Sequence, residues 1–563
     1  MPYRSPVSEY RFLLDQVVPL APLLQSDRFG HVTGDLADAV LAAAARVCDE
    51  VLAPLNRAGD RHPARLENGV VRTAPGFAEG FRAIADAGLV SMSAPSAYGG
   101  LDLPETLGTA VNEMMSGACM ALQLNPLLTQ GQIAALARHA SEAIKALYLP
   151  RLISGEWSGT MNLTEPQAGS DVGALSTRAE DAGDGTYRIT GQKIFITWGD
   201  SDVTSNVCHL VLARLPGAAT GTKGISLFLV PKFIPDAEGK LGRANDLKVV
   251  SLEHKMGVHG SPTCVMAYAG ATGWLVGEVN GGMAAMFTMM NAARLAVGIQ
   301  GVGLAEAALQ SAVGFAAERR QAGLIQDHPD VRRMLAVMKA DVFAARAIAV
   351  SCAMAMDMSH AGLGDVWTAR AAFLTPIAKA FCTDVGCSVT ETAMQVYGGM
   401  GYIEETGVAQ YYRDVRITPI YEGTNGIQAM DLIGRKLGDG GDAAFRLLDE
   451  VQADAVAARG FDAALAGDVW AAAETLRETT EWMLTQDMAD RAAGGVAYLR
   501  AFARVLGAQF HLRAARAAGG TGPRKALAEV YVRRLLPQYA AAIAEAKAGS
   551  GALFGLTPED LAA

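Results

Sequence analysis

Hydrophobic positions repeat at helical spacing through most of this chain. Between residue 34 and about residue 155, apolar side chains recur every three or four positions, as on one face of an amphipathic helix. The first stripe consists of Leu36, Val40, Leu41, Ala44, Val47 and Val51. Pro54 is expected to end this helix. A second helix is expected to begin with Phe77, Phe81, Ile84 and Leu89.

A methionine-rich stretch follows at residues 114–124. Methionine is adaptable and can line a ligand cavity, but its spacing here favours a core helix. The first 34 residues carry aromatic and aliphatic side chains followed by proline and glycine breaks. They are expected to form an arm that packs on the body through a short helix.

Between about residue 158 and residue 279 the pattern changes to short runs that alternate or are rich in β-branched residues. Four such runs lie at 186–190, 193–197, 209–213 and 225–230. Turn signals, among them Asp184-Gly185 and Pro216-Gly217, separate them. Several short strands at this spacing predict an antiparallel barrel or sandwich.

Helical periodicity returns at about residue 280. Apolar residues between 331 and 352 recur every three or four positions, as in a bundle helix. Gly298, Gly301 and Gly303 lie within helical sequence with no strand before them, so they predict close helix packing rather than a dinucleotide fingerprint. After a Gly/Asp-rich linker, an Ala-rich helical extension runs to about residue 550. Its basic residues are expected to form a solvated face: Arg524, Lys525, Arg533 and Arg534.

These patterns predict a mainly α protein with a central β domain. At 563 residues the chain is too long for a single core, and three or four domains are expected. The expected parts are an N-terminal arm (1–34), an N-terminal helical domain (35–157), a β-barrel domain (158–279), a helical bundle domain (280–437) and a C-terminal helical extension (438–563).

Composition excludes some classes of function. The net charge of −10 argues against a general nucleic-acid binder, which needs a basic face. The seven cysteines are scattered without a C-x-x-C pair, which is typical of thiols in a reducing compartment. No apolar run approaches the roughly 20 residues of a membrane span, and the N-terminus lacks a secretory apolar core. A cytoplasmic protein with no metal site is expected.

Glu422 is the candidate for chemistry. It follows Ile417, Pro419, Ile420 and Tyr421, so its carboxylate is expected to enter a largely apolar pocket. Burial raises the pKa of a carboxyl group towards the range where it can take a carbon-bound proton near neutral pH. Gly423 lets a flat ligand approach the backbone. From these residues alone, a loop glutamate that caps the next helix is an equally good interpretation.

Several segments resemble the acyl-CoA dehydrogenases. Residues 161–171 (M-N-L-T-E-P-Q-A-G-S-D) resemble the first flavin loop of that family, and residues 193–199 (K-I-F-I-T-W-G) resemble the second. Further matches follow in order and at family-like spacing: Arg294, Arg319, Gln395, Gly398, Gly399 and Glu422. Longer phrases are similar to a subgroup with longer chains, which contains the 3-methylmercaptopropionyl-CoA dehydrogenases of dimethylsulfoniopropionate (DMSP) breakdown.

The resemblance implies a fold and a reaction. The fold would be an N-terminal helical domain, an antiparallel β-barrel and a C-terminal four-helix bundle, here with an extra helical extension. The reaction would remove hydrogen from Cα and Cβ of an acyl-CoA thioester, with FAD as hydride acceptor and an electron-transfer flavoprotein as the next acceptor. Glu422 would be the Cα base. Its backbone N–H and a ribityl hydroxyl of FAD would stabilise the charge on the thioester oxygen.

The resemblance also implies ligand contacts. Thr164 and Thr197 would bind the isoalloxazine, and Phe195 would lie against it. The other implied flavin contacts are Met161, Leu163, Gly169, Ser170, Ile196 and Thr424. The implied substrate contacts are Ser170, Asn291, Arg294, Tyr421, Glu422 and Gly423. Arg319, together with Gln395, Gly398 and Gly399, would reach the FAD of an adjoining subunit, which requires at least a homodimer.

Some positions depart from the family pattern. Gln167 replaces a usual glycine, Asn291 stands where an aspartate often helps to hold CoA, and Gly426 replaces a glutamine. Ala322 and Asp330 fall where members often carry an aromatic residue and a glutamine. Some relatives carry the base on the helix that contains Arg294. In this chain that position is Ala293, which cannot act as a base, so Glu422 is favoured.

Two other functions fit the same segments. An acyl-CoA oxidase on this fold would be reoxidised by dioxygen and would release peroxide. A flavin-bound but catalytically inactive interaction protein would use the C-terminal helices to bind DNA or a partner. The intact Tyr421-Glu422-Gly423-Thr424 sequence argues against inactivity.

Overall fold

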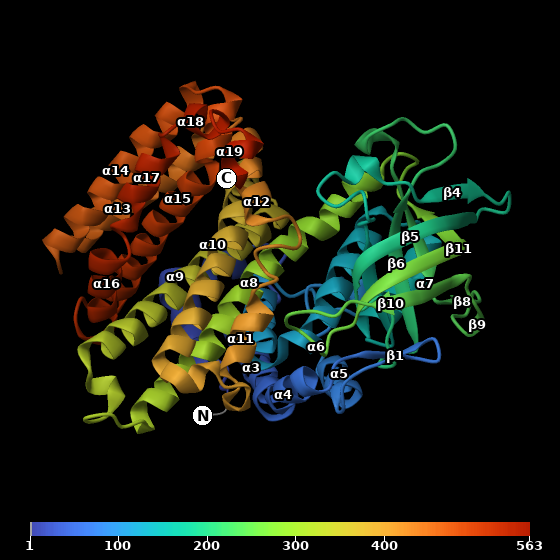
Figure 1. Ribbon diagram of the computed structural model, residues 1–563, viewed down its shortest axis with the longest axis horizontal. Coiled ribbons are helices and arrows are strands. Elements are labelled where there is room, and N and C mark those ends of the chain that lie inside the picture. The colour runs from blue at the N-terminus through green and yellow to red at the C-terminus, as the bar shows by residue number, and fades with distance from the viewer. Residues whose placement is uncertain (1–2) are drawn as a thin grey trace. The chain divides into compact units, whose positions relative to one another are not determined.

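The computed structural model describes residues 3–563. They form two compact units, each described here by itself. We call residues 39–293 the sheet unit, and residues 3–38 with 294–563 the bundle unit. Figure 1 labels most of the helices and strands of both.

Helices dominate the first part of the chain. They are α3 (Gly34–Arg46), α4 (Ala53–Arg61), α5 (Phe77–Asp86), α6 (Glu105–His139) and α7 (Glu142–Ile153). The prediction that Pro54 ends the first helix is wrong, because a π-helical turn at Val47–Leu52 leads from α3 into α4. Pro54 occupies one of the first two positions of α4, where a missing N–H is tolerated.

Helix α6 is a core helix, as predicted for the methionine-rich stretch. Met114, Met115 and Met120 are fully buried in it. The helix bends at Cys119, whose φ and ψ of −160° and 87° are not helical. It packs against the first strand of the large sheet.

Eleven strands lie in the described chain, and seven of them form one sheet. Its order is β3-β6-β7-β11-β5-β4, with β10 also paired to β11. The seven are β3 (Trp157–Asn162), β4 (Arg178–Asp181), β5 (Tyr187–Thr197), β6 (Asn206–Ala213), β7 (Ser226–Pro231), β10 (Leu247–Leu252) and β11 (Thr263–Val276). The short strands are β1 (Arg65–Glu67), β2 (Val70–Arg72), β8 (Phe233–Pro235) and β9 (Leu241–Ala244).

The large sheet curls into a barrel. Strand β11 pairs with β5 over its first part and with β7 over its last three residues, and bulges lie in its pairing with β5. Edge strand β4 meets the end of β6, where Ala179 N–H donates to the Arg214 carbonyl at 2.8 Å. The predicted antiparallel barrel is therefore present, except that β3 and β6 pair in parallel. Apolar side chains such as Ile189, Phe228 and Met266 fill its interior.

The bundle unit is built on long helices. Its main helices are α8 (Gly282–Glu318, of which residues from 294 belong to this unit), α9 (Pro329–His360), α10 (Asp365–Tyr397), α11 (Val408–Val415) and α12 (Asn425–Asp431). Helices α8 and α10 cross closely: a Cβ on Gly301 would lie 2.5 Å from the Cys382 carbonyl oxygen. Together with Gly298, whose Cβ would lie 3.1 Å from the Ala378 carbonyl oxygen, this confirms close helix packing at two of the three predicted glycines.

Helix α8 is also long and apolar enough to cross a membrane, by length and composition alone. The prediction that no run approaches such a span is therefore too strong. Since 56% of the apolar window is buried inside the protein, and core helices pass the same test, this is weak evidence for a membrane.

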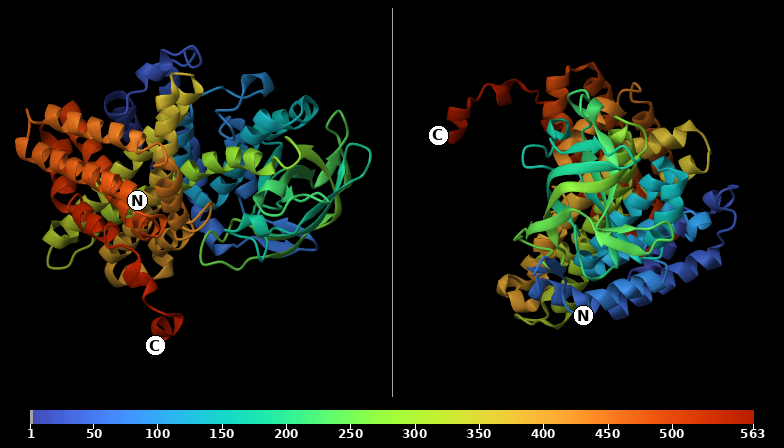
Figure 2. Two further views of the ribbon diagram at one scale, coloured as in Figure 1. Left: turned by 90° about the horizontal axis from the view of Figure 1, so that it is seen from above. Right: turned by 90° about the vertical axis from the view of Figure 1, so that its right-hand side faces the viewer.

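The C-terminal extension forms helices that pack on the same unit. They are α13 (Asp442–Ala458), α14 (Ala463–Thr485), α15 (Met488–Ala517), α16 (Gly522–Arg534) and α17 (Gln538–Ala546), followed by the short α18 (Gly551–Phe554) and α19 (Pro558–Ala562). Residues 551–563 are exposed, and Figure 2 shows this end of the chain projecting from the other C-terminal helices.

The N-terminal arm lies against this extension. Its short helices are α1 (Val7–Phe12) and α2 (Ala21–Leu24), and Tyr10 is fully buried. Arg524 of α16 donates to the Glu9 carboxylate at 2.6 Å and its guanidinium lies 4.2 Å from the centre of the Phe12 ring. The expectation that Arg524 belongs to a solvated basic face is therefore wrong.

Candidate active site

Glu422 lies in a tight loop between α11 and α12. Its φ is +55°, and Gly423 follows with φ of +85°. A left-handed conformation is unfavourable for a residue with a Cβ and is often maintained at functional sites. The Gln428 amide holds this backbone by donating to the Gly423 carbonyl at 3.1 Å. Thr424 is the N-cap of α12, accepting from the Ile427 N–H, so the alternative that Glu422 caps this helix is wrong.

The Glu422 carboxyl is partly buried and its chemistry is shaped by that setting. Burial raises its pKa to about 7, although the positive charges of Lys379 and Arg294 oppose the rise. Within residues 3–563 this carboxyl group makes no hydrogen bond or ion pair, and the Glu422 N–H has no acceptor. The loop therefore offers a carboxyl that titrates near neutral pH beside an available backbone donor.

Two cations accompany Glu422. Lys379 of α10 is buried, and its ammonium donates to the Asn425 side-chain oxygen at 2.9 Å. Burial lowers the pKa of Lys379 to about 8, while the Glu422 charge works in the opposite direction. Arg294 is 5% exposed and pairs with Asp431 at 3.0 Å. Its Nε is buried without a hydrogen-bond partner among the described residues, which leaves a donor available to a ligand.

In the sheet unit, one buried ion pair joins the two segments that resemble flavin loops. The Glu165 carboxylate receives the Lys193 ammonium at 2.8 Å, and the same ammonium donates to the Leu163 carbonyl at 2.9 Å. Ile194 N–H donates to the Thr164 carbonyl at 2.9 Å. The structure thus places Leu163 and Thr164 beside the end of β5.

Gln167, which departs from the family pattern, takes part in this network. Its amide donates to Glu165 at 2.7 Å, and Ser176 and Thr177 donate to the same carboxylate from backbone and hydroxyl groups. Burial alone would raise the pKa of Glu165, but Lys193 and these donors hold it far below its usual range. The first loop is consequently held by a fully hydrogen-bonded carboxylate.

The end of β5 turns one aromatic residue outward and another inward. Phe195 (φ +59°) is 59% exposed, whereas Trp198 (φ +53°) is fully buried, with its indole N–H donating to the Ala121 carbonyl at 3.2 Å. An exposed ring near the end of a strand, with Thr197 on the same strand and Thr164 in the neighbouring loop, suits a flat heteroaromatic ring with polar edges. The isoalloxazine of FAD fits that description.

The residues assigned to an adjoining subunit share one exposed surface of the bundle unit. Arg319, Gln395, Gly398 and Gly399 are all exposed at the ends of α8 and α10. Stacking of Phe315 on Tyr397, with centroids 4.0 Å apart, holds these helix ends together. Three apolar side chains beside them are also exposed: Met400 (45%), Tyr402 (86%) and Ile403 (44%). Exposed apolar clusters of this kind are common at interfaces.

The remaining candidate residues vary in exposure. Met161 and Tyr421 are partly buried, Ile196 is buried, and Gly169, Ser170 and Asn291 are exposed. Sequence reasoning gave no role to three residues that shape the sites: Lys379, Trp198 and Gln428. Trp198 stands in the segment that resembles the second flavin loop, and Lys379 is the one charge in the apolar run 371–382 of α10, whereas Gln428 gave no signal.

These features together define a flavin-dependent oxidoreductase. Four sequence profiles match the chain: acyl-CoA dehydrogenase, N-terminal domain, at residues 35–156; middle domain at 160–270; C-terminal domain at 280–438; and acetyl-CoA dehydrogenase C-terminal like at 447–557. The chain belongs to the acyl-CoA dehydrogenase family, whose members use FAD.

Individual proteins agree with this assignment. The chain is 46% identical to the 3-methylmercaptopropionyl-CoA dehydrogenase of Ruegeria pomeroyi, over 80% of this chain and 79% of that protein. The crystal structure of Caenorhabditis elegans ACDH-11 in complex with C11-CoA has a TM-score of 0.80 at 20% identity, covering 94% of this chain and 91% of that one. An acyl-CoA dehydrogenase of Bacillus anthracis complexed with FAD has a TM-score of 0.73 at 21% identity, covering 97% and 92%. These two structures bear on the fold alone.

Proposed function

We propose that this protein converts an acyl-CoA thioester to its trans-2-enoyl-CoA, with Glu422 as the base that takes the Cα proton. The observation that carries the proposal is the Glu422 carboxyl itself, whose pKa is raised to about 7 in a loop of left-handed backbone. A base with a pKa near the working pH combines an adequate ionised fraction with a strong driving force for proton transfer. When bound, FAD supplies the hydride acceptor for Cβ.

The chain's own groups would supply orientation and charge stabilisation. Removal of a Cα proton places negative charge on the thioester oxygen, and the unpaired N–H of Glu422 is a donor for it. Arg294, with its unpaired Nε, would help to bind CoA. Phe195 would pack against the isoalloxazine, with Thr164 and Thr197 at its polar edge.

The test of the base is Glu422→Gln, which keeps the shape of the side chain and removes its basicity. We expect this variant to retain FAD and to bind acyl-CoA, but to reduce its flavin ~10²-fold or more slowly in anaerobic stopped flow. Glu405→Gln, which changes an exposed glutamate just before α11 and outside the Glu422 loop, is the matched control and should behave as wild type. A normal rate of flavin bleaching in Glu422→Gln would refute the assignment.

The proposed substrate is 3-methylmercaptopropionyl-CoA or another short acyl-CoA. Support comes from the 46% identity to the relative of that name. Pentanoyl-CoA is the matched comparison because it replaces the sulfur with a methylene at the same chain length. A kcat/KM for the methylthio thioester at least ~10-fold above that for pentanoyl-CoA would support the proposal and with it a role in DMSP breakdown. Equal kcat/KM values would instead indicate an enzyme that acts on short acyl-CoAs in general.

The electron acceptor and assembly follow from the same proposal. We propose an electron-transfer flavoprotein as acceptor, and a cytoplasmic homo-oligomer in which Arg319, Gln395, Gly398 and Gly399 reach a neighbouring FAD. The alternative, an acyl-CoA oxidase, predicts one peroxide per turnover in air without added acceptor. Rapid turnover only with an electron-transfer flavoprotein or a ferrocenium salt would exclude the oxidase.

A further inference from the structure

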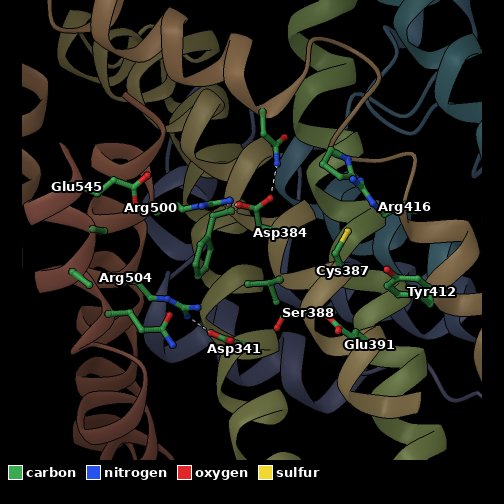
Figure 3. A pocket seen from close by; sticks show the side chains of 17 residues that line it. Asp341, Asp384, Cys387, Ser388, Glu391, Tyr412, Arg416, Arg500, Arg504 and Glu545 are labelled. Carbon is green, nitrogen blue, oxygen red and sulfur yellow. Dashed lines mark hydrogen bonds and ion pairs between the residues drawn. The ribbon is translucent and has the colours of Figure 1, made fainter. Parts of the chain in front are cut away.

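A chain of polar contacts runs from the C-terminal extension to the loop that carries Glu422. Asp384 of α10 lies in the middle of it, and its two carboxylate oxygens take different partners. One accepts from the Asn425 amide at 2.8 Å, and the other accepts from Arg500 Nε of α15 at 3.1 Å. Asp384 and Arg500 both line a cleft of about 670 Å³. Figure 3 shows their side chains pointing toward each other.

Asn425 is held from both ends of its amide. Its nitrogen donates to Asp384, and also lies 3.0 Å from the Thr383 hydroxyl. Its oxygen accepts from the Lys379 ammonium at 2.9 Å. Because the Lys379 ammonium donates to the oxygen of this amide, a rotation of the Asn425 side chain would shift the Lys379 charge.

We propose that Asp384 and Arg500 are positioning residues for Glu422: they fix the Asn425 amide, which keeps the Lys379 ammonium beside the Glu422 carboxyl. This inference rests on the proposed function of Glu422 as the base. It gives the C-terminal extension a part in the reaction, because Arg500 belongs to α15. The exposed fractions of the two side chains, 54% for Arg500 and 31% for Asp384, make their pair worth little as a stability element alone.

The charges around the site set the direction of the effect. Glu422 faces Lys379 and Arg294, while Lys379 faces Glu422, Asp384 and Arg294. A nearby ammonium favours the ionised form of Glu422, so loss of that ammonium raises the pKa of Glu422. Asp384→Asn removes a charge that supports protonated Lys379. Arg500→Ala leaves Asp384 able to turn towards Lys379 and to draw it away from Glu422.

The test is the pH profile of flavin reduction at saturating acyl-CoA, measured anaerobically. The acidic limb of this profile is the range in which the rate falls as the pH drops. In both variants we expect it to move to higher pH by roughly half to one unit, so that the rate at pH 6 is roughly 3- to 10-fold below that of wild type. The rate above pH 9 should equal that of wild type, because Glu422 is ionised there in every variant. A structural role alone would lower the melting temperature or the FAD content without moving the limb.

A second readout does not depend on turnover. The protonated carboxyl band of Glu422, isolated as the infrared difference between each protein and its Glu422→Gln counterpart, should titrate at higher pH in Asp384→Asn and Arg500→Ala. Arg500→Lys, which keeps one donor towards Asp384, should restore the wild-type titration. Arg516→Ala removes a half-exposed arginine on the same helix that pairs with Asp454 instead, and should leave the profile unchanged.

Failure of this inference can be told apart from failure of the proposed function. If Glu422→Gln loses flavin reduction while Asp384→Asn and Arg500→Ala keep the wild-type profile and band, the positioning role is wrong and the base assignment stands. If Glu422→Gln reduces its flavin normally, the base assignment is wrong and the inference falls with it. If Asp384→Asn fails to fold, the comparison of Arg500→Ala with Arg500→Lys still tests the positioning role. Both variants should fold, because the Arg500 side chain is largely exposed.

Discussion

The ammonium of Lys193 lies 2.8 Å from the carboxylate of Glu165, and both side chains are almost completely buried, at 0% and 2% exposure. The pair joins the loop after β3 to strand β5, which are the two segments proposed to hold FAD. Burial lowers the pKa of Lys193 to about 8 against the attraction of Glu165, so the ammonium is retained largely because its partner is present.

Breaking this pair should therefore cost both stability and cofactor. Lys193→Met leaves a buried carboxylate without its cation, a change that typically costs about 3–5 kcal/mol. We expect the melting temperature to fall by roughly 10 °C and the FAD content of the purified protein to drop. Differential scanning calorimetry and the ratio of flavin to protein absorbance measure the two effects.

The exposed pair Arg243–Asp246 is the matched control, with side-chain exposures of 58% and 56%. Arg243→Met should change the melting temperature by no more than a degree or two, because exposed ion pairs contribute ~0–1 kcal/mol. If the melting temperature of Lys193→Met were as high as that of Arg243→Met, the buried pair would have no structural role.

Phe195 and Trp198 offer a sharper separation of binding from folding. Phe195→Ala removes an exposed ring, so the apoprotein should melt as wild type while the FAD dissociation constant rises roughly 10-fold, from a lost stacking of about 1–1.5 kcal/mol. Trp198→Ala removes a fully buried ring and should cost about 3–5 kcal/mol of stability instead. Titration of the Phe195→Ala apoprotein with FAD, followed by flavin fluorescence, measures the change in the FAD dissociation constant. An unchanged FAD affinity in Phe195→Ala would exclude it as the flavin platform.

Much of this architecture is predictable because it depends on the spacing of hydrophobic side chains within single helices and strands. The helical spacing of α9, the short β-branched runs of the barrel and the methionine-rich core of α6 each follow from side chains within one element. The raised pKa of Glu422 also agrees with the burial that the sequence predicted for this carboxyl group. Such features need no knowledge of distant partners.

What escaped prediction depends on partners far apart in the chain. Lys379 lies 43 positions before Glu422 in the sequence (422 − 379). Only the packing of α10 brings its charge close enough to act on the Glu422 carboxyl. Glu9 and Arg524 pair across 515 positions, so neither charge shows locally that it is not solvated. The continuation of the helix through Pro54 depends on a π-turn, and the parallel pairing of β3 with β6 depends on the order of strands in the barrel.

A buried ion pair in the bundle unit should make the protein sensitive to acid. Glu306 is 5% exposed and pairs with Arg346 at 2.8 Å. Burial alone would raise the pKa of Glu306, but Arg346 and Lys339 hold it at about 2. Because the folded pKa lies below the unfolded one, the stabilisation is complete above about pH 4.5 and is lost as the pH falls towards 2.

The whole contribution of Glu306 corresponds to about 3 kcal/mol at neutral pH. Glu306→Gln removes this titration. We expect the variant to melt several degrees earlier than wild type at pH 7 but to lose less additional stability between pH 5 and pH 3. Melting curves across that range make the comparison, and parallel pH dependences of the two proteins would contradict it.

The rate of flavin reduction should itself titrate with Glu422. Its carboxyl must be ionised to accept a proton, and burial raises its pKa to about 7, so the active fraction falls as the pH drops through 7. At pH 6 about one molecule in ten carries the ionised form, and the rate should be roughly 10-fold below its alkaline plateau. Single-turnover stopped flow between pH 5.5 and pH 9 measures this limb, and in Glu422→Gln the residual rate should be flat over the same range. A wild-type limb centred near pH 4.5 would mean that water reaches the carboxyl in the working enzyme, and the desolvated pocket on which the proposed chemistry depends would not exist in that state.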